Sequence, residues 1–522
     1  MNVRRVLSCA ALCLSLSGWA VLPTPAAAQV PLVVESRKIV PADGAAGDRF
    51  GAAVAVEGGS ALVGALFADD RGDDAGSAYL VDAASGQIQR KLLANDRTRE
   101  IFGFDDDLFG HDVDLQGSLA LIGAVNSSQA GTLAGAVYVF DAVNGRRLAK
   151  LLPFSFFGDP SFQAFGFSTA LSDQFIAVGA PGDVDRGSGA GALYLYRTSD
   201  RQRVAKVFAQ DAGFADNLGY RVAVSGSTAV ASAPFDDDGG TDAGAVYVFD
   251  AATGDQRLKL RADDASAQQF FGLSLAVDDG VVAVGAPFDD DSGQSAGAVY
   301  LMDAITGAQL RKLTAPNGQA GDQFGFSVAL SSKFVLVGAP TADVAGDDAG
   351  TVYVFDRQSG ALLAELRASD AATGDVFGNA LDVSGGTVVV GALRDGDRGE
   401  QSGAAYLFEI AGLGGGGELA SSARVSSITP TAVAAGFLRA RAQVTVTVAD
   451  NLGQPVAGAI VTLAVSGDIT EVLSGSTGAS GAVTLTSNQR SRVPVSFTAC
   501  VVGVVAALPH VPSDDVETCD GV

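Results

Sequence analysis

Residues 271–288 read FGLSLAVDDGVVAVGAPF, an alternating apolar run that begins with Phe-Gly and closes on Gly-Ala-Pro and a last Phe. Residues 324–341 read FGFSVALSSKFVLVGAPT, so the same pattern returns 53 residues later. Alternation at period two around an Asp-Asp-Gly turn is typical of a β-hairpin. The stretch therefore predicts two antiparallel strands inside a unit that the chain repeats.

Three short signatures define this repeat. A Phe-Gly pair, replaced once by Leu218-Gly219, recurs at intervals of 59, 56, 53, 53, 53 and 53 residues. A signature like Gly-Ala-Pro begins 14 residues after each pair, and Gly-x-x-Tyr begins 12 residues later still. Because neither internal spacing varies in seven copies, each copy is one structural unit with a fixed register. The first residues of the seven pairs are Phe50, Phe109, Phe165, Leu218, Phe271, Phe324 and Phe377.

Each unit contains four predicted strands. The hairpin supplies two, a run such as GAVYVFD supplies the third, and a shorter run such as QRLKL supplies the fourth. Units of this length with four antiparallel strands are blades of a β-propeller. The chain is therefore expected to be all-β, with a seven-bladed β-propeller. Gly and Ala would let backbones approach near the axis, Phe would pack between sheets, and Pro would end a strand.

The ring is expected to close through the N-terminal segment. The last Gly-x-x-Tyr strand, GAAYLFEI, is followed by no fourth strand, whereas the first Phe-Gly is preceded by one at residues 34–40. We therefore predict that this N-terminal strand completes the last blade, which removes two open sheet edges.

On these signatures, residues 34–410 resemble the FG-GAP repeats that build the propeller of integrin α subunits and of many secreted bacterial proteins. The resemblance implies an extracellular binding module, often used in adhesion, whose partner would be a protein or a glycan. Integrin blades that bind calcium carry D-x-D-x-D-G-x-x-D between Phe-Gly and Gly-Ala-Pro. Every unit here lacks that loop, so that calcium site is not implied, and the sequence is more similar to the shorter bacterial form of the repeat.

Aspartates gather instead between Gly-Ala-Pro and Gly-x-x-Tyr, in loops expected on one face of the ring together with the blade-to-blade connections. Two interpretations stay open: Asp and Gly as turn-forming, solubilising residues, or carboxylates as Ca²⁺ ligands, since calcium takes six to eight oxygens. The candidate metal ligands are Asp236, Asp237, Asp238, Asp242, Asp289, Asp290, Asp291, Asp347 and Asp348. No other cofactor is expected.

The ends of the chain predict export and a second domain. Arg4 and Arg5, an apolar run and a small-residue cleavage site indicate a signal peptide at 1–28, so the protein is expected to be secreted, at the cell surface or periplasmic. The propeller is assigned to 29–410, a Gly/Ser linker to 411–423, and a further domain to 424–522. The net charge of −25 excludes a nucleic-acid partner and disfavours anionic lipid.

The C-terminal domain reads as a β-sandwich of short strands. Through DNLGQPVAGAIVTLAVSG and SGAVTLTS it resembles bacterial immunoglobulin-like domains. Cys500 and Cys519 are the only cysteines beyond the signal peptide, and in an exported chain we expect them to form a disulfide.

The sequence favours a binding protein over an enzyme. His111 and His510 are the only histidines and fall in different domains, and nucleophile or phosphate-loop motifs are absent. A packing or surface role is expected for His111. The alternatives are a structural surface or matrix protein without a specific ligand, and a carboxylate-dependent enzyme acting on polysaccharides. Oligomeric state and ligand identity are left open.

Overall fold

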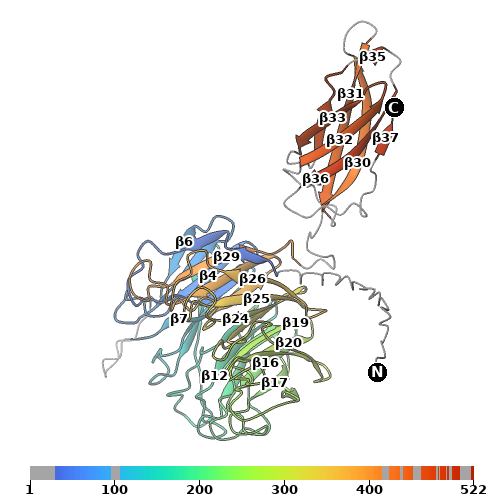
Figure 1. Ribbon diagram of the computed structural model, residues 1–522. Helices are drawn as coiled ribbons and strands as arrows, with labels where there is room; N and C mark the ends of the chain where they lie inside the picture. Colours follow the sequence, from blue (N-terminus) through green and yellow to red (C-terminus); the bar gives the residue numbers. More distant parts are fainter. Residues whose placement is uncertain are drawn as a thin grey trace, which may run out of the picture.

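The computed structural model of the chain is drawn in Figure 1. It describes residues 30–95, 106–413, 423–434, 439–450, 460–477, 480, 482–489, 491–492, 496–505 and 519–521. All regular elements in these ranges are β-strands. The predicted signal peptide, most of the predicted linker and His510 lie outside the described residues. No helix capable of crossing a membrane is found in the described part of the chain.

The repeats form seven blades, each containing four antiparallel strands in which neighbours along the chain pair with one another. The first three blades are β3 (Phe50–Glu57), β4 (Ser60–Ala65), β5 (Ser77–Asp82), β6 (Ile88–Leu92); β7 (Phe109–Gln116), β8 (Leu119–Ala124), β9 (Ala136–Asp141), β10 (Arg147–Leu151); and β11 (Thr169–Leu171), β12 (Phe175–Ala180), β13 (Ala192–Arg197), β14 (Arg203–Val207). The next three are β15 (Val222–Ser225), β16 (Thr228–Ala233), β17 (Ala245–Asp250), β18 (Gln256–Leu260); β19 (Ser274–Asp278), β20 (Val281–Ala286), β21 (Ala298–Asp303), β22 (Gln309–Leu313); and β23 (Ser327–Leu330), β24 (Phe334–Ala339), β25 (Thr351–Asp356), β26 (Leu362–Arg367).

The seventh blade joins the two ends of the ring, as predicted. Its strands are β27 (Leu381–Ser384), β28 (Thr387–Ala392), β29 (Ala404–Glu409) and the N-terminal β2 (Arg37–Ile39). Strand β2 pairs antiparallel with β29, with Arg37 opposite Leu407 and Ile39 opposite Ala405. The sequence did not predict a further strand, β1 (Leu32–Val34), which pairs in parallel with β26 of the sixth blade. The N-terminal segment therefore holds two neighbouring blades together.

The signatures of the repeat meet where one blade packs on the next. A Cβ atom added to Gly285 would lie 2.0 Å from the carbonyl oxygen of Gly325 in the following blade. One added to Gly297 would lie 2.1 Å from the oxygen of Phe324. The Phe324 ring is fully buried between the fifth and sixth blades and packs against the Tyr353 ring in a tilted arrangement, with centroids 5.5 Å apart. At Gly285 and Gly297 a side chain would collide with the neighbouring backbone, although the fourth blade has Ser232 at the position of Gly285.

The C-terminal strands form two further sheets around one apolar core, a β-sandwich. One sheet contains β30 (Ala423–Ala434), β31 (Arg439–Asp450), β34 (Ala482–Thr486) and β35 (Ser491–Arg492). The other contains β33 (Glu471–Ser476), β32 (Ile460–Gly467), β36 (Phe497–Val505) and β37 (Cys519–Gly521). Strands β36 and β37 pair with Cys500 opposite Cys519, and the disulfide between them stays a prediction.

Candidate functional site on the loop face

The loops between the second and third strands of each blade and the connections between blades emerge at the same end of the sheets. In the fourth blade, for example, β16 ends at Ala233 and β15 begins at Val222, and both positions lie at one end of that sheet. We call the surface formed by these loops the loop face. It carries the predicted aspartates, so it is where a binding site was expected.

Three groups of aspartates converge on this face, and we call each group a trio. The carboxylate oxygens in a trio lie within 4.8 Å of one another, a spacing that a metal ion could bridge. Each trio joins two residues of a second-to-third-strand loop with one residue from the preceding blade connection. The trios are Asp211, Asp236 and Asp238; Asp264, Asp289 and Asp291; and Asp370, Asp395 and Asp397.

A lysine ammonium group lies at the centre of every trio. In the fourth blade Nζ of Lys259 lies 2.7 Å from Asp211, 2.8 Å from Asp236 and 2.6 Å from Asp238. Lys312 contacts its trio at 2.6–2.9 Å, and Lys38, supplied by the closing strand β2, contacts its trio at 2.6–2.8 Å. The protein thus supplies its own cation to these carboxylates.

The lysine ammonium group and the aspartate carboxylates of a trio shift one another's pKa values. Partial burial acts to lower the pKa of Lys259, but its hydrogen bonds to the three aspartates outweigh burial and raise it above its ordinary value. For Asp211, burial acts to raise the pKa, and the hydrogen bond from Lys259 prevails and lowers it. The Lys259 ammonium and the Asp211 carboxylate therefore stabilise each other's charged forms.

The nine predicted metal ligands divide into two groups. Asp236, Asp238, Asp289 and Asp291 belong to the trios. Asp237, Asp242 and Asp290 lie in the same loops but outside the trios, and Asp347 and Asp348 lie in the corresponding loop of the sixth blade. Several of these five residues take part in turn hydrogen bonds. Oδ1 of Asp237 accepts from the backbone N–H of Asp242, Oδ1 of Asp290 accepts from Ser295, and the N–H of Asp348 donates to Asp343. The backbone oxygen of Asp347 accepts from Gly374.

The lysines carry a signal that the sequence reasoning missed. Lys38, Lys91, Lys150, Lys206, Lys259 and Lys312 follow one another at intervals of 53, 59, 56, 53 and 53 residues, in step with the blades. The next position in this series is Glu365, and in that sixth blade Ala342 takes the place of Asp236. The sixth blade thus has neither the lysine nor this aspartate, whereas the first and second blades keep Lys91 and Lys150 although Ala68 and Ser127 take the place of Asp236.

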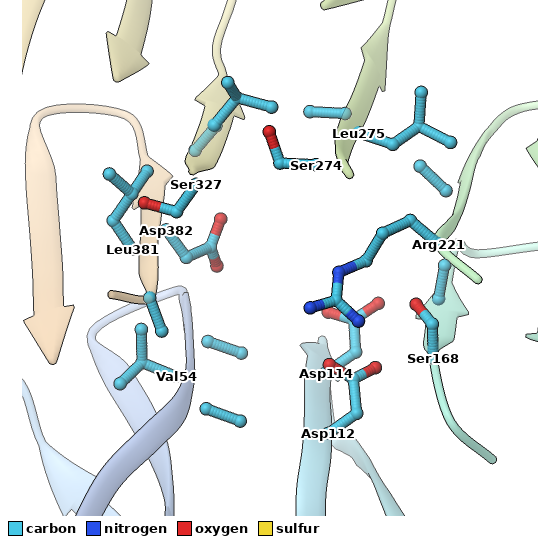
Figure 2. Close-up of a pocket in the computed structure, with 18 of the residues that line it drawn as sticks. Val54, Asp112, Asp114, Ser168, Arg221, Ser274, Leu275, Ser327, Leu381 and Asp382 are labelled. Carbon is cyan, nitrogen blue, oxygen red and sulfur yellow. The ribbon is translucent and has the colours of Figure 1, made fainter. Parts of the chain in front are cut away.

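A second feature of the propeller is a pocket of about 300 Å³ on its axis, lined by residues at or next to the first strands of all seven blades. Figure 2 shows the Arg221 side chain reaching toward Asp112 and Asp114, with Asp382 on another side of the pocket beside Ser327. His111, which also lines the pocket, packs against Phe167 with centroids 4.8 Å apart, in keeping with a packing role. This pocket was not predicted from the sequence.

Several polar side chains of the pocket connect one blade to the next. Oδ2 of Asp114 accepts from the N–H of Leu171 at 2.5 Å, and Oδ2 of Asp382 accepts from Val56 at 2.7 Å. The hydroxyl of Ser327 donates to the carbonyl of Gly378 at 2.7 Å. First strands of neighbouring blades share no backbone ladder, so these side chains satisfy backbone groups that would otherwise lack a partner.

Burial shifts the titration of the pocket residues. Desolvation, with a contribution from the charge of Asp382, raises the pKa of Asp114 to about 8, and desolvation raises that of Asp382 to about 6. Desolvation, followed by the charge of Arg221, lowers the pKa of His111 to about 4. Burial therefore shifts the buried Asp114 and Asp382 toward their neutral acid forms and His111 toward its neutral imidazole form.

An arc of aromatic rings lies beside the pocket on the loop face. Phe167 contacts Tyr220 with centroids 4.8 Å apart, and Arg221 lies over both rings. The chain of contacts continues from Tyr220 through Phe235 and Phe270 to Phe288, with centroids 5.4–5.9 Å apart. These rings are partly exposed, unlike the buried rings of the Phe-Gly pairs.

Further phenylalanines in the blade connections are open to solvent. Phe157 and Phe214 are 83% and 81% exposed, and Phe156 and Phe162 are also exposed. Exposed apolar side chains point to an interaction surface where they form a contiguous patch, and singly they are common on any protein surface.

Comparison with protein families gives one match. The description of the matching family is FG-GAP repeat, and it covers residues 33–81, 88–140, 161–196, 202–249, 255–302, 308–355 and 362–408. The chain therefore belongs to the FG-GAP repeat family, whose repeats form β-propellers that often serve in ligand binding or adhesion. No curated protein matches the chain.

Proposed function

We propose that this protein is an exported, non-enzymatic binding protein of the adhesion type, which uses the loop face of its propeller to hold an extracellular protein or glycan. The observation that carries the proposal is the joint presence, on one face, of exposed phenylalanines, an aromatic arc and acidic loops. Aromatic side chains provide large contact areas at low entropic cost, and the acidic rim favours basic or hydroxyl-rich partners.

The C-terminal sandwich is proposed to be an immunoglobulin-like domain of the bacterial type. Its role would be to space or present the propeller, with Cys500 and Cys519 joined after export. This proposal rests on the sandwich architecture and on the register that sets the two cysteines opposite each other.

The binding proposal is tested with a matched pair of double variants in the full chain. Phe157→Ser with Phe214→Ser removes exposed rings from the loop face. Val143→Ser with Ile305→Ser removes comparably exposed apolar groups, 72% and 81% exposed, from turns at the opposite face. Ligands found on protein and glycan arrays should bind the first variant about tenfold or more weakly and the second unchanged. Equal binding by both variants, or no saturable ligand, would favour a structural role instead.

Calcium binding by the acidic loops is a second proposal for the same face. It is favoured by the three trios, and it requires Ca²⁺ to displace an ammonium group from each of them. Lys312→Met should therefore raise calcium affinity relative to the natural protein, because it leaves Asp264, Asp289 and Asp291 without a cation. Calorimetry that detects calcium binding by neither protein, with no calcium-dependent change in melting temperature, would rule the proposal out.

A further inference from the structure

The cluster of the third blade differs from its counterparts in the fourth and fifth blades. Nζ of Lys206 lies 2.5 Å from Asp183 and 2.6 Å from Asp185, and the three side chains are 0%, 0% and 1% exposed. Lys259 and Lys312 keep 16% and 19% of their side-chain surface exposed. The ammonium and carboxylates of the third blade are therefore closed off from water.

Aromatic rings form the cover over this cluster. Nζ of Lys206 lies 5.2 Å from the ring centroid of Phe154, 5.5 Å from Phe156, 5.3 Å from Phe208 and 5.2 Å from Tyr194. Phe154 and Phe156 belong to the connection between the second and third blades, whose sequence PFSFFGDPSF has no equivalent in the other blades. A dry site of this kind makes charged groups costly and favours chemistry that removes charge.

The hydrogen bonds of the third blade also differ. In the fourth blade Asp236 accepts hydrogen bonds from both Lys259 and Tyr247. In the third blade the hydroxyl of Tyr194 turns instead toward the Phe154 carbonyl and Gln163. Oδ2 of Asp183 has no hydrogen-bond partner, although Nζ lies only 2.5 Å away. The amine is therefore in contact with this carboxyl group outside hydrogen-bonding geometry.

Asp185 is positioned differently from Asp183. Its oxygens accept from the hydroxyl of Ser155 at 2.7 Å, from the N–H of Phe156 at 2.9 Å and from Lys206 at 2.6 Å. The Asp185 carboxyl group is therefore held in place by three donors, whereas the Asp183 carboxyl group accepts the N–H of Asp185 through Oδ1 and faces the amine through Oδ2.

We propose that Lys206 and Asp183 join in an isopeptide bond that the folded third blade forms by itself, with Asp185 carrying the proton. A proton passes from the Lys206 ammonium to the Asp183 carboxylate, which leaves a neutral amine and a carboxylic acid. Nζ then attacks Cγ of Asp183. Asp185 takes the second proton from the nitrogen and returns it to the departing hydroxyl, so one water leaves and one amide forms.

Three physical conditions favour this reaction. Burial, opposed by the charge of Lys206, raises the pKa of Asp183, which favours the acid form that loses water. The fold holds the amine in contact with the carboxyl group, so the reaction itself carries little entropic cost for bringing the two groups together. The aromatic cover excludes water that would hydrolyse the amide. The net change converts a buried ion pair to a neutral amide.

Mass spectrometry of the purified, reduced full-length protein tests the proposal. The intact mass should fall below that of the processed sequence by the mass of one water. Trypsin should release a branched peptide in which residues 151–186 are joined to residues 204–221, because a linked Lys206 is not cleaved. Recovery of these segments only as linear peptides, with cleavage after Lys206, would overturn the proposal.

Variants separate the roles of the three residues. Lys206→Arg and Asp183→Ala should abolish the branched peptide, and Asp185→Ala should reduce its yield. Lys259→Arg is the matched control in the fourth blade, and it should leave both the branched peptide and the intact-mass deficit unchanged. Full linkage in Asp185→Ala would show that this residue is not the proton carrier.

Discussion

The third and fifth blades contain the same groups in different surroundings. Each has a lysine on its fourth strand, two loop aspartates two residues apart and a buried tyrosine on its third strand. In the fifth blade the lysine remains partly solvated and a blade connection contributes Asp264, whereas in the third blade phenylalanines close over Lys206. The repeat therefore places the charges, and the connections between repeats decide whether water reaches them.

The largest expected difference between the two blades is in stability. Relative to wild-type protein in which the isopeptide bond has not formed, Lys206→Met leaves two buried carboxylates without a cation, and we expect a loss of about 3–5 kcal/mol in the free energy of unfolding. Lys312→Met leaves partly solvated carboxylates, and the loss should be about 1 kcal/mol or less. Urea denaturation of the two variants measures both values. Equal losses would show that the aromatic cover does not set the environment of Lys206.

A smaller effect is expected from opening the cover. Phe154→Ala should cost about 1–2 kcal/mol, below the cost for a fully buried ring, because Phe154 is only partly buried. Phe154→Ala should also let water reach the ammonium group of Lys206, so that Lys206 becomes partly solvated like Lys312 in the fifth blade. In a double-mutant cycle, Lys206→Met should therefore cost less in the Phe154→Ala background than alone. Strict additivity of the two losses would contradict this coupling.

The smallest expected effect is a pH dependence of opposite sign in the two blades. Burial acts to raise the pKa of Asp264, but its hydrogen bond to Lys312 prevails and lowers that pKa. The ionised Asp264 therefore stabilises the fold above the unfolded-state pKa of ~3.9, and this stabilisation is lost as the pH falls through the folded-state pKa. The stability loss from Asp264→Asn, about 1 kcal/mol or less, should therefore be seen at neutral pH and disappear in acid.

The pH dependence expected for Asp183 has the opposite sign to that for Asp264. Burial raises its pKa, so as a free acid it favours folding at low pH, and that contribution is lost as pH rises through the folded pKa. Melting curves of Asp183→Asn and Asp264→Asn between acid and neutral pH compare the two signs. If Asp183 is bound in an amide, the wild-type third blade shows no such titration, which supports the isopeptide proposal independently of mass spectrometry.

Sequence reasoning recovered much of the fold but only part of the site. Fixed spacing of Phe-Gly, Gly-Ala-Pro and Gly-x-x-Tyr predicted the blades, and the surplus strand at the N-terminus predicted β2 as the closing strand. Strand β1 was missed because it lies outside the repeat pattern, and its pairing with the sixth blade therefore has no signature in the repeats. Asp236 and Asp289 were selected for their oxygens, but the lysines that lie between those oxygens were overlooked because they are distant in sequence.

By itself, the sequence determined the architecture of the ring. Glycines that admit a neighbouring backbone, prolines that end strands and alternating apolar residues act over a few positions, so their effect can be read locally. Only the tertiary structure decided the electrostatics, because burial and charge pairing depend on which segments meet in space. The axial pocket exists only once seven blades have closed around one axis. The ammonium group inside each trio and the dry cluster of Lys206, Asp183 and Asp185 exist only once a fourth strand has paired beside the loop of its blade.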